Sequence, residues 1–208
     1  YTLASGTHNF SVSRREINAT LSRHYDSTTN APGSNLSSFD SLQAGETLSL
    51  SGSGTIASKD VGNSKSVTIG SIALTDGTGT ASNYELNSVV MNVTKKPLSL
   101  TGSKTYDGTT AASASALSIN SGLVGSETLV LSGSGTLNTA NVGTNSLTSN
   151  ASGVSLGDGS NGGLAANYTL TGGTHQMTVG QRALILSGSR LYDSTSTVSS
   201  SDLSTITG

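Results

Sequence analysis

A Tyr-Asp pair occurs three times in this chain of 208 residues, each time ahead of a run of Ser and Thr. The surrounding segments read LSRHYDSTTNA, GSKTYDGTTAA and GSRLYDSTSTV, and the pairs are Tyr25-Asp26, Tyr106-Asp107 and Tyr192-Asp193. Such a pair could bind a sugar, with the ring stacked on the sugar face and the carboxylate accepting hydroxyl hydrogen bonds. Alternatively, the Tyr fills the end of a small core and the Asp caps the following turn. Because the pair recurs once per unit, we expect the structural role.

Two positions beside the pair vary between the copies. The residue three before the Asp is Arg23, Lys104 or Arg190, so a Lys-Asn isopeptide cross-link cannot be common to all copies. The residue after the Asp is Gly only at Gly108 and is Ser in the other two copies. Since Ser adopts a positive φ far less readily than Gly, the sequence argues against a positive φ there in every copy.

One segment matches the pattern around a nucleophilic serine. GVSLG (153–157) fits GxSxG, but it lacks the strand-to-helix context of a nucleophile elbow. Ser155 also aligns with Ala73 in the preceding repeat, so the hydroxyl is not a repeated feature. We expect no catalytic residue, no enzymatic activity and no cofactor.

Candidate metal ligands are sparse. His24 has Asp26 nearby but no third ligand in the local sequence. The loops 75–79 and 157–163 each offer one Asp, whereas a calcium cage usually needs several carboxylates. Cysteine is absent, which removes thiolate sites and thiol nucleophiles. The sequence therefore predicts no metal site.

The chain repeats itself with a period of slightly more than 80 residues. GETLSLSGSGT (45–55) aligns with SETLVLSGSGT (126–136), and the segment 1–17 aligns with 168–184. Asn83-Tyr84 likewise aligns with Asn167-Tyr168. These alignments predict four parts: 1–13, the tail of a preceding repeat; 14–94 and 95–180, two full repeat units; and 181–208, the start of a following repeat.

Short segments of each unit alternate apolar and polar residues, which is typical of half-buried strands. Thr47–Ser51 and Thr128–Ser132 are the clearest examples, and Gly-rich turn segments separate such stretches. With 26 Gly, 11% charged residues and no Trp, each unit can bury only a small core. These features predict an all-β fold of tandem immunoglobulin-like β-sandwiches. A short helical turn near 111–117 would instead favour β-grasp-like repeats.

The order of these motifs resembles a known bacterial repeat. KTYDGTTAA, then GSETLVLSGSGT, NVGT, ANYTL and a fresh start at QRALILSG, is similar to the YDG repeats. These repeats are relatives of the MBG domains and occur in large secreted adhesins of the filamentous-haemagglutinin type. The resemblance implies a stalk or spacer of a secreted adhesin, on the bacterial cell surface or in a biofilm matrix. The alternative function is a series of low-affinity carbohydrate-binding modules.

Charge and hydropathy limit the partners. The net charge is −2 and the ten Lys and Arg are dispersed, whereas nucleic-acid binding needs clustered cations. No apolar run approaches the roughly 20 residues that span a bilayer, so we expect no membrane insertion in this segment. The expected partners are neighbouring repeats of the same chain. Exopolysaccharide or another cell surface would be bound through other domains.

Overall fold

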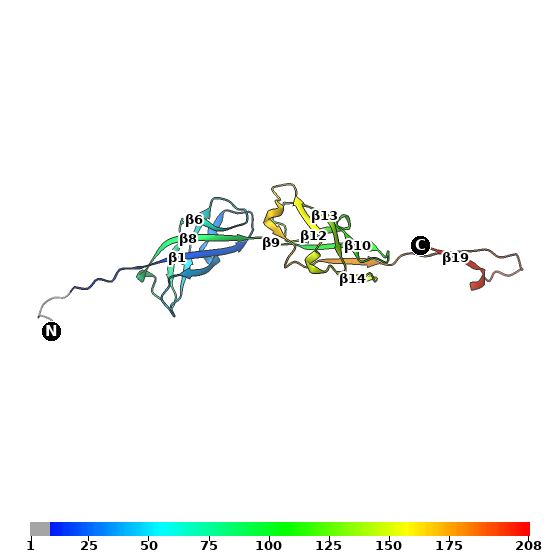
Figure 1. Cartoon of the computed structure of the whole chain (residues 1–208), viewed down its shortest axis with the longest axis horizontal. Coiled ribbons are helices and arrows are strands. Elements are labelled where there is room, and N and C mark those ends of the chain that lie inside the picture. Colours follow the sequence, from blue (N-terminus) through cyan, green and yellow to red (C-terminus); the bar gives the residue numbers. More distant parts are fainter. Residues whose placement is uncertain (1–8) are drawn as a thin grey trace. The chain divides into compact units, whose positions relative to one another are not determined.

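The computed structural model describes residues 9–208 (Figure 1). These residues form two compact units. The first extends to Lys96 and also includes Ala166–Tyr168; the second comprises Pro97–Ala165 and Thr169–Gly208. Most of the expected tail segment 1–13, together with His8, lies outside the described residues.

The first unit is built around a six-stranded sheet in the order β2-β5-β6-β8-β1-β3. Its strands are β1 (Arg15–His24), β2 (Asn30–Pro32), β3 (Leu36–Asp40), β5 (Ser53–Ile56), β6 (Gly62–Thr68) and β8 (Tyr84–Thr94). A separate antiparallel pair consists of β4 (Leu48–Ser51) and β7 (Ala73–Asp76), and the 3-10 helices η1 (Gly33–Asn35) and η2 (Ala81–Asn83) lie in connections.

The first and last strands of this unit are parallel neighbours. β1 pairs with β8 from Arg15 opposite Tyr84 to His24 opposite Thr94, with one register shift after Ile17. Figure 1 shows the two arrows running side by side in the same direction. The other neighbours of these strands, β3 and β6, are antiparallel to them.

Alternation along the strands places their apolar residues in the core. In β1 the residues Ile17, Ala19 and Leu21 are buried, and the intervening positions are partly exposed. β8 contributes Val89, Met91 and Val93 in the same period-2 pattern. Tyr84, at the start of β8, packs with Ile17 and Leu48 in a cluster bordered by Phe39, Leu42, Leu74 and Ala81.

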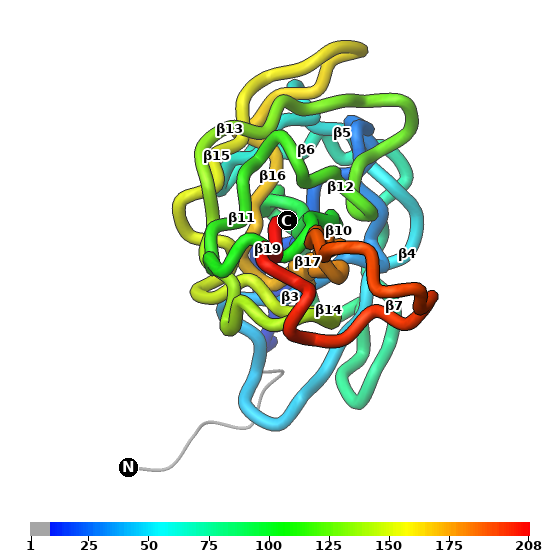
Figure 2. Tube along the Cα trace, turned by 90° about the vertical axis from the view of Figure 1, so that its right-hand side faces the viewer, coloured from blue at the N-terminus to red at the C-terminus, as the bar shows by residue number. Residues whose placement is uncertain are grey.

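In the second unit the main strands are divided between two sheets. One sheet has the order β12-β10-β17-β14, and β13 lies between β11 and β15 in the other. In the view of Figure 2, β11, β13 and β15 lie to the left of β10, β12, β14 and β17. The bounds are β10 (Ser99–Thr105), β11 (Ala111–Ser113), β12 (Leu117–Ser121), β13 (Leu129–Thr136), β14 (Gly143–Ser146), β15 (Val154–Asp158) and β17 (Gln176–Gly180). Again an early and a late strand, β10 and β17, are parallel.

Leu100, Leu137, Met177 and Val179 belong to the buried cluster of this second unit. The 3-10 helices are η3 (Ala114–Ala116), η4 (Ser149–Ala151) and η5 (Ala165–Asn167). The short strands β9 (Lys96–Pro97) and β16 (Tyr168–Thr169) form a two-stranded sheet. At the C-terminal end, β18 (Ile185–Gly188) pairs with β19 (Leu203–Thr207), and η6 (Ser200–Asp202) precedes β19.

The prediction of an all-β chain is confirmed. The regular elements of the described residues are strands and 3-10 helices, and the short helical turn left open near 111–117 is η3. The immunoglobulin-like sandwich remains a prediction. Within residues 9–208, no helix is long and apolar enough to cross a membrane.

Candidate functional site

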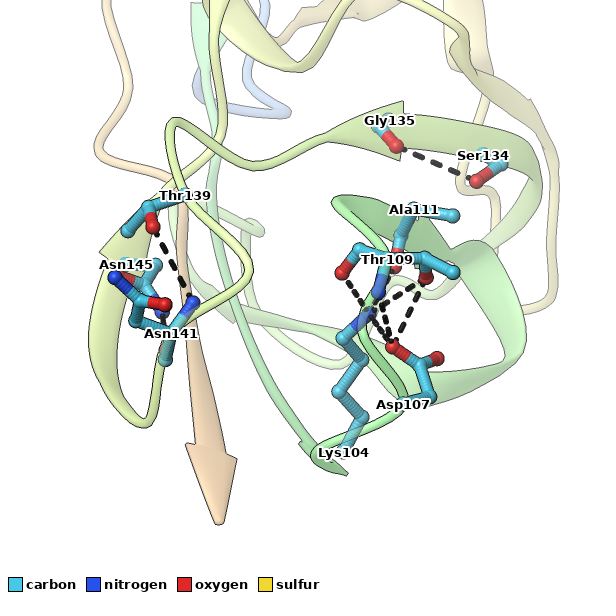
Figure 3. A network of polar contacts seen from close by, with 9 residues as sticks. All are labelled: Lys104, Asp107, Thr109, Ala111, Ser134, Gly135, Thr139, Asn141 and Asn145. Carbon is cyan, nitrogen blue, oxygen red and sulfur yellow. Dashed lines mark hydrogen bonds and ion pairs between the residues drawn. The ribbon is translucent and has the colours of Figure 1, made fainter. Parts of the chain in front are cut away.

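The Tyr-Asp pair of the second unit lies in a turn that is closed by a lysine (Figure 3). Lys104 Nζ donates to Asp107 Oδ1 at 2.9 Å, to the Thr109 carbonyl at 2.8 Å and to the Ala111 carbonyl at 2.9 Å. Asp107 Oδ1 also accepts from the backbone N–H of Thr109 at 2.9 Å and from its hydroxyl at 3.0 Å. The carboxylate therefore caps the turn, and the ammonium fills the centre of that turn.

The same arrangement occurs in the other two copies. Arg23 pairs with Asp26, and its guanidinium also donates to the Thr28 carbonyl. Arg190 pairs with Asp193 at 2.7 Å and reaches the Thr195 carbonyl. The Asp accepts from the Thr N–H at 2.9 Å in both copies. A basic residue, an Asp three positions later and a Thr two further on thus define a corner that we call the Tyr-Asp corner.

The expectation against a positive φ in every corner is wrong. Ser27, Gly108 and Ser194 have φ values of 66°, 76° and 64°. A left-handed conformation costs an L-residue of this kind about 1–2 kcal/mol. We attribute its retention at both serines to the hydrogen bonds on either side, which fix the path of the backbone.

Electrostatics favour the ionised form of Asp107 and Asp193. The hydrogen bonds from Lys104 and from the Thr109 backbone and hydroxyl lower the pKa of Asp107 to about 2. The Thr195 backbone and hydroxyl lower the pKa of Asp193, with a smaller contribution from Arg190. Each of these carboxylates is therefore occupied by partners within its own corner.

The three tyrosines of the corners differ in exposure. Tyr25 is fully buried, Tyr106 is 40% exposed and Tyr192 is 92% exposed. The backbone of the first two is held alike, since Tyr25 N–H donates to the Thr94 carbonyl and Tyr106 N–H to the Gly180 carbonyl, both at 2.9 Å. The difference in exposure therefore arises from what covers each ring.

A segment from much later in the chain covers Tyr25. The Tyr168 ring meets it edge to face, with centroids 5.5 Å apart and an interplanar angle of 76°. Beside it, the carboxamide of Asn167 donates to Asp60 Oδ1 and accepts from the Val61 N–H, both at 2.9 Å. We call Tyr25, Asp60 and Val61 the Asn-Tyr socket of the first unit.

The Asn167 side chain is buried in the socket and its polar groups are hydrogen-bonded there. Asn167 is only 1% exposed, and both of its side-chain hydrogen bonds are made inside the first compact unit. Its amide is the main cause of the lowered pKa of Asp60, which burial opposes and Ser58 supports. Lys59 Nζ lies 5.9 Å from the centroid of the Tyr25 ring, within reach of a cation–π interaction.

The two described histidines and the serine of the GxSxG match have structural surroundings. His175 is buried, with Nε2 2.7 Å from the Leu170 carbonyl, and His24 Nδ1 lies 3.0 Å from the Lys95 carbonyl. Ser155 is the second residue of β15 and does not lie at a strand-to-helix turn. Over residues 9–208 no group of three His, Asp or Glu is placed to hold a metal ion.

A family model decides what kind of repeat carries these corners. The YDG domain model matches residues 13–91 and 93–179. The chain belongs to the YDG domain family. No curated protein and no solved structure was found to match it.

Sequence reasoning about these YDG domains missed two features. The basic residue of the corner was considered only as a cross-linking lysine, although its constant place three before the Asp was a usable signal. Asn167 was seen only as part of a repeated segment. Its contact with Asp60 joins residues 107 positions apart, which the local sequence could not reveal.

Proposed function

We propose that this pair of YDG domains is a load-bearing spacer, a stalk segment of a secreted bacterial adhesin at the cell surface or in a biofilm matrix. The observation that carries this proposal is the parallel pairing of the first and last strands of the first unit. Pulling on a stalk loads each unit through its two chain ends. The response therefore depends on which strands the ends belong to.

In the first unit the load would fall on a long ladder. All ten residues of β1 have partners in β8. Because the strands are parallel, a force on the start of β1 and the end of β8 acts along the strands in opposite directions. The hydrogen bonds between them are then loaded together in shear, and none can open without its neighbours. An antiparallel terminal pair would instead be opened one hydrogen bond at a time.

The second unit has the same design with a shorter ladder. Ser103, Lys104 and Thr105 pair in parallel with Thr178, Val179 and Gly180, and a parallel bridge joins Leu100 to His175. We therefore expect this unit to resist force less well than the first.

Secretion and the adhesin context rest on the family and the sequence. The dispersed charge, the hydroxyl-rich composition and the absence of cysteine suit a long extracellular array. Serial carbohydrate binding has weaker support, because a stacking platform must be exposed and the Tyr25 ring is fully buried.

Single-molecule pulling between engineered cysteines tests the mechanical role, and the chain has no native cysteine to interfere. Handles at S13C and K95C load β1 and β8 in shear, whereas handles at S13C and S82C pull both strands from the same end. We expect the shear geometry to require a several-fold higher unfolding force for the first unit. Equal forces in the two geometries would refute the spacer mechanism.

A further inference from the structure

We propose that the second unit carries an open socket that binds an Asn-Tyr segment of another YDG repeat. The site consists of Tyr106, Asn141 and Val142. This inference concerns recognition between repeats and does not depend on the mechanical role proposed above. It begins from the filled socket of the first unit.

The strand register around the two sockets is the same. In the first unit Val93 of β8 lies opposite Arg23 of β1 on one side and Gly62 of β6 on the other. The socket residues follow directly, with Tyr25 two positions after Arg23, and Asp60 and Val61 immediately before Gly62.

In the second unit Val179 of β17 lies opposite Lys104 of β10 and Gly143 of β14. Tyr106 again comes two positions after the basic residue, and Asn141 and Val142 immediately precede the Gly. Figure 3 shows the Asn141 loop and the Lys104–Asp107 corner at the same end of the unit. The backbone therefore places these three residues as it places Tyr25, Asp60 and Val61.

The chemistry of the two sockets matches as well. Asn141 offers a carboxamide oxygen where Asp60 offers a carboxylate, and either can accept from the side-chain amide of an incoming Asn. Val142 brings a backbone N–H to the place of the Val61 N–H. The Asn141 loop is fixed from within, because Asn145, itself 7% exposed, donates to the Asn141 carbonyl at 2.7 Å.

The two sockets differ in whether another segment covers them. Tyr106 is 40% exposed and Val142 is 52% exposed, whereas Tyr25 beneath Tyr168 is fully buried. Among the described residues, only the first socket has an Asn-Tyr segment on it. The occupant that fits the second is the same dipeptide, as in Asn83-Tyr84 or Asn167-Tyr168. A third Tyr-Asp corner at Arg190–Thr195 marks a further repeat that could supply it.

The second socket lacks a counterpart of Lys59, which predicts weaker binding there. Lys59, over the Tyr25 ring, aligns with Ala140, so the cation–π contact has no counterpart there. Without this cation–π contact we expect an affinity about two- to fivefold lower at the second socket.

A completed third repeat tests the proposal. Gly208 occupies the place of Gly122, 86 residues earlier, as Tyr192 does of Tyr106. The full chain is therefore extended after Gly208 by a second copy of residues 123–180, which supplies a third Asn-Tyr segment. We expect the Val142 amide to gain protection from hydrogen exchange and Tyr106 to become resistant to nitration by tetranitromethane. Replacing the added Asn and Tyr by Ala should reverse both effects.

Unchanged exchange at Val142 in an extended chain whose third repeat is folded would overturn the proposal. A second test needs no third repeat: K59A with D60N gives the first socket the residues of the second. We expect the Val61 amide to stay protected and Tyr25 to stay resistant to nitration. If this variant releases Asn167, an Ala-Asn-Val socket cannot hold the segment and the proposal fails.

Discussion

The side-chain amide of Asn167 donates to the carboxylate of Asp60 across 2.9 Å, although 107 residues separate them in sequence. The same carboxamide accepts from the Val61 N–H, and the neighbouring Tyr168 covers Tyr25. Three residues of the second repeat thus complete the first compact unit. The five predictions below follow from this socket and from the Tyr-Asp corners.

We expect Asn167→Ala to destabilise the first unit by about 1–3 kcal/mol, because it removes a buried carboxamide and leaves the half-buried Asp60 and Val61 groups without that partner. Hydrogen exchange of the β1 and β8 amides measures the loss of stability of the first unit separately from the second. The matched control is Asn83→Ala, which removes the exposed Asn of the other Asn-Tyr segment. Equal effects of the two substitutions would contradict the assignment of the socket.

Asn167→Ala should also raise the pKa of Asp60 towards the ordinary value of an aspartate, about 3.9. The Asn167 hydrogen bond is the main cause that keeps this pKa low. A carboxyl titration followed by NMR in the two proteins reports the change directly. If the Asp60 titration is unaltered, Ser58, Lys59 and Lys65 keep the pKa low and Asn167 is not the main cause.

The two corner tyrosines should differ in their contribution to stability. Tyr25→Ala removes a fully buried ring and should cost about 3–5 kcal/mol, as large aromatic truncations do. Tyr106→Ala should cost clearly less, since 40% of that residue is already in solvent. Denaturant unfolding with residue-level NMR detection separates the two units. Equal losses would show that the exposure of Tyr106 in the structure is not its exposure in solution.

The contribution of Asp107 to the stability of the second unit should be lost only at unusually low pH. The folded-state pKa of Asp107 is lowered to about 2, so its contribution to stability is fully present above the unfolded-state pKa, about 3.9. That contribution is lost as the pH falls from there through about 2. In Asp107→Asn this part of the pH dependence should vanish. A native titration of Asp107 near 4 would contradict the caging by Lys104 and Thr109.

The left-handed residue after the corner Asp is open to a direct test. Gly108→Ala should destabilise the second unit by about 1–2 kcal/mol through backbone strain alone, since an added Cβ meets no atom within 4 Å. The control is Gly180→Ala, where the new Cβ would make an ordinary contact, 3.8 Å from the Lys104 carbonyl. Ser27→Gly should change stability little, because relief of strain offsets the greater freedom of Gly in the unfolded chain.

Local features of the fold could be predicted from the sequence. In β4 the expected alternation places Leu48 and Leu50 in the core and Ser49 and Ser51 outside, because side chains alternate across a strand. The short helical turn that the sequence left open near 111–117 is present as η3, where the Ser113 side chain accepts a hydrogen bond from the Ser115 N–H.

Features that join distant parts of the chain could not be predicted in this way. The parallel pairing of β1 with β8 depends on long-range register, for which period-2 patterns carry no signal. The socket depends on a contact between two repeats. The left-handed Ser27 and Ser194 were missed because the hydrogen bonds of the corner outweigh the preference of a single residue.

The place of Asn167 and Tyr168 also sets an order of events as the chain is made. Synthesis proceeds from the N-terminus, so residues up to Lys96 emerge well before Ala166–Tyr168. Until those three residues arrive, the Tyr25 ring lacks its edge-to-face contact with Tyr168, and Asp60 and Val61 lack their hydrogen bonds to Asn167. Each YDG domain built in this way would mature one repeat late, and would be finished by its successor.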